Sequence, residues 1–120
     1  MLDAAFWILG ITVAGGLAIG CFYLLERPIR GLARWVSVGH GLLGVAGSVL
    51  FFAVMAAGPP DKGGMGQVAT SLLIGALAGA AVVVLAQVRR RRPSSLVVAL
   101  HATLGAAGYV VLAAYATTPQ

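Results

Sequence analysis

Residues 40–47 read HGLLGVAG and residues 101–108 read HATLGAAG, so one pattern, His-x-x-Leu-Gly-x-Ala-Gly, occurs twice in the chain. The two segments contain the only histidines, His40 and His101, and both segments lie within long apolar runs. Hydrocarbon penalises ionisable side chains, so an ionisable residue inside a membrane span is by default a functional candidate. Two of them at matching positions of a repeated pattern strengthen that interpretation.

The composition is typical of a bilayer protein. Hydrophobic residues make up 60% of the 120 residues and charged residues only 9%, and a chain of this length forms one domain at most. The net charge of +5 does not indicate nucleic-acid binding, because the basic residues gather at the ends of the apolar runs. Cys21 is the only cysteine, which excludes an internal disulfide and any Cys-x-x-Cys metal or redox site.

Four apolar stretches are long enough to cross a membrane as helices. They cover about residues 4–25, 32–57, 65–88 and 95–116, and a hydrocarbon core of about 30 Å needs about 20 residues at about 1.5 Å each. The sequence therefore predicts an all-α, integral membrane four-helix bundle, with residues 1–120 forming a single transmembrane domain in contact with the lipid bilayer.

The arginines predict the orientation of this bundle. All seven lie in or beside the links that join the first span to the second and the third span to the fourth. The link on the other side has only Lys62, next to Asp61. Because cytoplasmic links are enriched in basic residues, both termini are expected outside the cytoplasm, in a bacterial inner membrane.

An internal repeat accounts for the two histidine segments. Gly10 and Pro28 align with Gly75 and Pro93 at one offset, and the histidine segments align at an offset four residues shorter. The chain thus reads as a two-helix unit written twice in parallel orientation, over residues 1–57 and 65–117. A pseudo-two-fold axis along the membrane normal would bring both histidines to a similar depth.

Each histidine shares its helical face with two glycines, one and two turns further along. At about 100° per residue, these pairs fall within one narrow sector beside the histidines; they are Gly44 and Gly47, and Gly105 and Gly108. We expect the second and fourth helices to face each other through these glycines, because missing side chains leave room for a flat macrocycle.

The histidine pair predicts a haem site. Neutral imidazole is an ordinary ligand of haem iron, so His40 and His101 would hold one haem b as its two axial metal ligands. The remaining ring nitrogens are expected to bond the backbone carbonyls of Val36 and Val97, one turn back. Arg34, with the other arginines of that side, is expected to reach the haem propionates.

This layout resembles the haem-bearing core of the cytochrome b family. In that family four helices hold haem through histidines of the second and fourth helices, which His40 and His101 match, and glycines let the porphyrin sit close. The family also has a second histidine about four turns along each helix, where this chain has Val54 and Tyr115. The resemblance therefore implies one bis-histidine haem and no relay through two haems.

The predicted function is electron transfer, either as a small protein or as a haem-bearing membrane subunit that exchanges electrons with a quinone or a redox enzyme. A cofactor-free anchor or assembly subunit is the first alternative, since histidines also hydrogen-bond between helices. A small transporter or channel fits less well, because no acid lies in mid-span. Another tetrapyrrole, an oligomer and a larger complex stay open.

Overall fold

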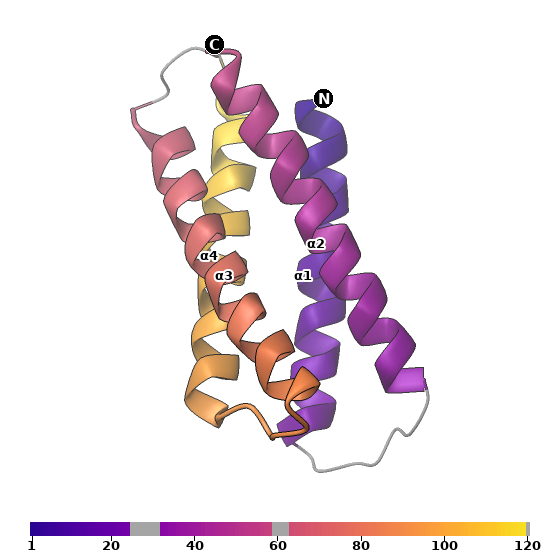
Figure 1. The fold of residues 1–120 in the computed structure, drawn as a ribbon. Coiled ribbons are helices and arrows are strands. Elements are labelled where there is room, and N and C mark those ends of the chain that lie inside the picture. The colour runs from indigo at the N-terminus through magenta and orange to yellow at the C-terminus, as the bar shows by residue number, and fades with distance from the viewer. Residues whose placement is uncertain (25–31, 59–62, 120) are drawn as a thin grey trace.

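The computed structural model describes residues 1–24, 32–58 and 63–119, without the side chains of residues 24 and 32–34. It confirms the predicted all-α class with four helices (Figure 1). In chain order these are α1 (Leu2–Leu24), α2 (Leu32–Ala56), α3 (Met65–Val88) and α4 (Ser95–Thr117). The chain runs up and down the bundle, so that α1 is parallel to α3 and α2 is parallel to α4.

All four helices are long and apolar enough to cross a membrane. Helices of 23 to 25 residues are about 35 Å long, which exceeds a hydrocarbon core of about 30 Å. Their outward faces are as apolar as their inward faces, with Trp7, Leu42 and Val110 each about two-thirds exposed. A helix that is apolar all round belongs in lipid, so this is a multi-pass membrane protein with four candidate spans.

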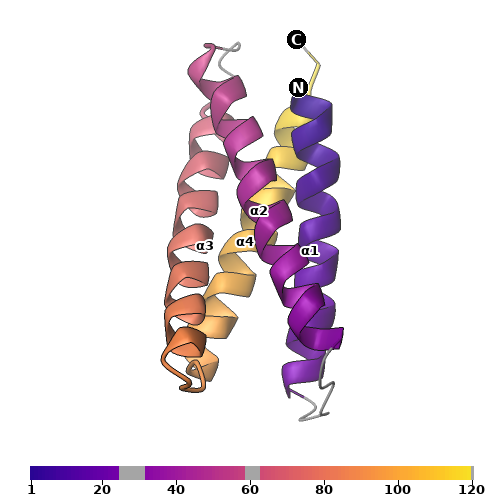
Figure 2. The ribbon, with the colours of Figure 1, turned by 45° about the vertical axis from the view of Figure 1, so that its right-hand side comes forward.

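Helices that follow one another in the chain pack side by side. α1 packs against α2 and α4, and α3 packs against α4 and α2, as short links between consecutive helices favour. Among the described residues, the backbones of α2 and α4 do not meet, because these helices occupy diagonal corners. Both termini lie at one end of the bundle and the α3–α4 link lies at the other (Figure 1, Figure 2).

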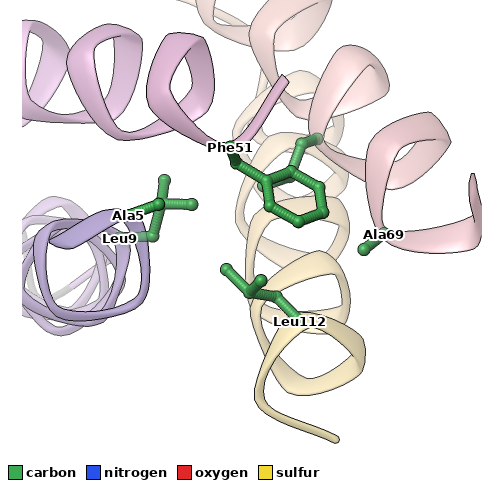
Figure 3. Packing of buried hydrophobic residues seen from close by; sticks show 6 residues of the cluster. Ala5, Leu9, Phe51, Ala69 and Leu112 are labelled. Atoms are coloured by element: carbon green, nitrogen blue, oxygen red, sulfur yellow. The ribbon is translucent and has the colours of Figure 1, made fainter. Parts of the chain in front are cut away.

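The buried apolar core occupies the half of the bundle that contains the termini. All four helices contribute to it (Figure 3). The contributing residues of α1 and α3 lie in the first half of each helix, and those of α2 and α4 lie in the last third. The members of the core are Ala5, Leu9, Phe51, Ala69, Leu73 and Leu112. Phe51 and Leu112 are fully buried. The helices thus pack against one another at the end of the bundle that contains the termini. The opposite end, where the α3–α4 link contains Arg89 to Arg92, is the arginine end.

Glycines let the helices pack closely within this arrangement. A Cβ atom added at Gly47 would lie 2.8 Å from Leu9 Cγ on α1, and one added at Gly108 would lie 3.2 Å from Leu72 Cβ on α3. These positions are therefore filled by side chains of the adjacent helix. The expectation that Gly47 and Gly108 face each other across the bundle is wrong, because α2 and α4 are diagonal rather than adjacent.

We predict that Gly47→Ala is less stable than Gly41→Ala by about 1–3 kcal/mol, the usual cost of overpacking. Gly41 is the matched control, because a Cβ atom there would meet nothing within 4 Å, and alanine also favours the helix more than glycine. Thermal unfolding of both variants in the same detergent measures the difference. Equal unfolding midpoints for the two variants would show that the Leu9 side chain moves aside at no cost in stability.

Candidate functional site

His40 and His101 meet inside the bundle although their helices lie diagonally. His40 comes from α2 and His101 from α4, and their ring centroids are 6.0 Å apart with the ring planes at 86°. Both rings are partly buried. The structure thus brings together the two residues that the repeated sequence pattern singles out.

Each imidazole is anchored to the helix that precedes its own. His40 Nδ1 lies 2.9 Å from the carbonyl oxygen of Thr12 on α1, and His101 Nδ1 lies 2.8 Å from that of Ala76 on α3. The prediction of Val36 and Val97 as partners is wrong. Both rings turn away from their own helix toward its neighbour, whose carbonyl oxygens have a second lone pair beyond the one used in the helix.

These bonds decide which ring nitrogen carries the proton. A carbonyl oxygen can only accept, so Nδ1 must be the donor in the neutral imidazole of both His40 and His101. Nε2 then keeps its lone pair on both rings, which is the state in which imidazole binds a metal. Backbone carbonyls in this role also fix the orientation of metal-binding histidines. Both rings are therefore oriented by backbone carbonyls, and Nε2 is the nitrogen with the free lone pair whenever the ring is neutral.

Two further glycines seat the imidazoles. A Cβ atom at Gly16 on α1 would lie 2.6 Å from His40 Cε1, and one at Gly79 on α3 would lie 3.0 Å from His101 Cβ. The sequence marks both only as small positions for helix packing, since the register of α1 against α2 cannot be read from either helix alone. No sequence signal singled them out, because the neighbouring partners Thr12 and Ala76 contribute only backbone carbonyls.

A cavity of about 260 Å³ opens beside the histidine pair. It is much larger than one water molecule, whose share of liquid volume is about 30 Å³. All four helices line it, and most of its wall consists of glycine, alanine and aliphatic side chains. The residues around it lie mainly toward the arginine end, and the cavity adjoins the apolar core at Leu9 and Leu73, which belong to both.

The four predicted glycines divide into two kinds. Gly44 and Gly105 line the cavity together with the histidines. Gly47 and Gly108, one turn further along, pack against α1 and α3 instead. The two pairs differ because the interior of the bundle changes from cavity to packed core along its axis. A helical wheel shows only the angles around one helix, so it does not show this change.

Polar side chains mark the arginine end of the cavity. Tyr23, Ser37 and Gln87 line it there, and the Tyr23 hydroxyl donates to the carbonyl oxygen of Pro93 at 3.0 Å. The side chain of Arg34 lies outside the described residues, so its predicted contact with propionates stays a prediction. The cavity is apolar beside the histidines and polar at the membrane edge.

The described residues contain no group of three or more His, Cys, Asp or Glu side chains that could hold a metal ion. Within the described part of the chain, the histidine pair could therefore offer a metal ion two imidazole nitrogens. Searches with this chain against protein-family models, curated proteins and solved structures found no match.

Proposed function

We propose that this protein is a membrane-embedded haem b protein, in which His40 and His101 are the two axial ligands of one haem between α2 and α4. The observation that carries the proposal is the pair of imidazoles 6.0 Å apart, each tied at Nδ1 to a backbone carbonyl. Haem is the cofactor that needs only two ligands from the protein, whereas a structural zinc site needs four.

The distance between the rings fits one shared metal atom. Two in-line bonds of about 2 Å, typical of imidazole nitrogen on a metal ion, plus about one ring radius on each side, give about 6 Å between centroids. The observed separation is 6.0 Å. The separation of the two rings is thus compatible with one shared iron.

The lining of the cavity supports a mostly apolar ligand. Glycines at positions 16, 44 and 105 line it beside the histidines, where larger side chains would fill the space. Tyr23, Ser37 and Gln87 supply hydrogen-bonding groups at the opposite edge, on the side where Arg34 and the other arginines follow in the chain. This is the edge at which haem propionates would leave the membrane.

Electron transfer is the activity that such a site favours. When bound, haem supplies one-electron redox chemistry. His40 and His101 would both hold the haem, which would favour electron transfer over oxygen activation, and the cavity wall beside them is mostly apolar. A quinone or a redox enzyme is the proposed electron partner, and the chain acts alone or as the haem-bearing subunit of a larger complex.

Titration of the purified protein with haemin tests this proposal. We expect saturation at one haemin per chain, with a Soret band of low-spin, six-coordinate haem. The cofactor-free anchor subunit is the alternative, because the Nδ1 hydrogen bonds alone satisfy a histidine between helices. Haemin binding that is weak, unsaturable and high-spin would favour the anchor.

The orientation and the repeat belong to the same proposal. We place both termini on the non-cytoplasmic side of a bacterial inner membrane, because the arginines follow α1 and α3 and not α2. Descent from a duplicated two-helix unit agrees with the parallel roles of the two hairpins, since in each the second helix bonds its histidine to the first.

Tags at the two termini test this topology. We expect both tags to be labelled by a membrane-impermeant reagent in intact cells, and a tag inserted after Arg91 to be labelled only after the cells are opened. A cytoplasmic C-terminus would reverse the assignment and would place the polar edge of the cavity outside the cell.

A further inference from the structure

The turn between α3 and α4 presents four consecutive arginines, Arg89 to Arg92, all of them exposed. The turn is fixed at its start by a Schellman arrangement: the Arg91 N–H donates to the Ala86 oxygen at 2.8 Å, and the Arg90 N–H donates to the Gln87 oxygen at 2.9 Å. The guanidinium groups therefore project from a defined backbone.

The end of the turn is fixed as well. The Ser94 hydroxyl accepts a hydrogen bond from the Val97 N–H at 3.3 Å and so caps α4. Tyr23 on α1 donates to the Pro93 carbonyl oxygen at 3.0 Å. The arginine turn is thus tied to α1, α3 and α4 at the membrane edge.

Arg90 occupies a backbone conformation that normally belongs to glycine. Its φ is 54°, in the left-handed region, and glycine is the usual residue at this position of a Schellman motif. Glycine would form the same turn with less strain. The arginine side chain therefore contributes something other than folding, and the property that distinguishes it is its charge.

The positive charge of the turn has no acidic partner nearby in the described part of the chain. Asp3 is the only described acid, and it lies in the first turn of α1 at the opposite end of the bundle. The backbone N–H groups of residues 89–91 already bond to carbonyls of α3. An anion would therefore be bound by the guanidinium groups, which match phosphate with paired hydrogen bonds.

Apolar side chains directly beside the turn extend this site into the membrane. Val88 at the end of α3 is 74% exposed and Leu96 at the start of α4 is 68% exposed. A phospholipid whose phosphodiester group bound the arginines would place its acyl chains along these residues. We propose that Arg89 to Arg92 bind the headgroup of an anionic phospholipid, independently of whether the histidines hold haem.

Lipid titration of the purified full-length protein tests this site. Thermal unfolding in a zwitterionic detergent is followed as phosphatidylglycerol, phosphatidylcholine or inorganic phosphate is added. We expect only phosphatidylglycerol to raise the midpoint. Because one basic residue near a lipid surface is worth about 1 kcal/mol, Arg90→Gly should weaken the apparent affinity about fivefold, and the double variant R91Q/R92Q about 25-fold.

Two further comparisons separate lipid binding from folding. Arg90→Gly should unfold at a higher temperature than wild type in phosphatidylcholine, because the strain is relieved, yet gain less from phosphatidylglycerol. Arg90→Lys keeps both charge and strain and should retain more lipid affinity than Arg90→Gly. An equal effect of inorganic phosphate, or an unchanged phosphatidylglycerol affinity in Arg90→Gly, would overturn the proposal, whatever the haem content.

Discussion

Replacing His40 or His101 by alanine is expected to abolish six-coordinate, low-spin haem. Each imidazole is proposed to supply one axial ligand, and the sequence contains no third histidine to take its place. A single replacement should leave a five-coordinate or empty haem site, and the double replacement should leave no protein ligand for haem. Visible absorption and iron content of the purified variants measure the loss.

Two comparisons distinguish ligation from a structural role. Gly39→Ala changes the residue beside His40 at a position outside the cavity lining, where a Cβ atom meets nothing within 4 Å, so it should keep the wild-type spectrum. In His101→Gly, added imidazole should restore the low-spin spectrum, because it can occupy the space of the missing side chain. A low-spin spectrum that survives in both single alanine variants would contradict the assignment.

The second large effect is expected at Gly16, which touches the histidine without being a ligand. In Gly16→Ala the new Cβ atom would lie 2.6 Å from His40 Cε1, so the ring must turn. That movement breaks the bond from Nδ1 to the Thr12 carbonyl. Loss of such an orienting bond typically lowers metal affinity about 10- to 100-fold, and we expect haem affinity to fall by this amount.

Gly15→Ala provides the matched control for Gly16→Ala. The two glycines are adjacent on α1, and a Cβ atom at Gly15 meets nothing within 4 Å. Haemin titration should therefore find wild-type affinity in Gly15→Ala and weakened binding in Gly16→Ala. If both variants bind haemin like wild type, the contact between His40 and Gly16 on α1 has no part in haem binding.

The helices could be predicted from the sequence because length and apolar composition alone determine them. α3 (Met65–Val88) has the predicted bounds, and α1 begins at Leu2, two residues before the predicted span. The neighbours of each helix were harder to predict. The apolar residues surround every helix, so no stripe indicates which face is buried, and α2 was wrongly placed against α4.

Some residues of the candidate site could likewise be predicted from the sequence, whereas others could not. The histidines were visible because they are ionisable residues in apolar runs, and Gly44 and Gly105 followed from their helical spacing. Thr12 and Ala76 could not be found, because they contribute only backbone carbonyls, which every residue has. Sequence spacing identifies side chains on one helix, whereas these partners depend on the register between two helices.

The most direct test of the haem proposal is a reduced-minus-oxidised absorption spectrum of the wild-type protein as purified, with a pyridine haemochrome assay on the same sample. The proposal predicts a Soret band and the sharp visible bands of low-spin haem b, at one haem per chain. A protein without a Soret band and without iron would contradict it, and His40 and His101 would then serve as hydrogen-bonding residues between helices.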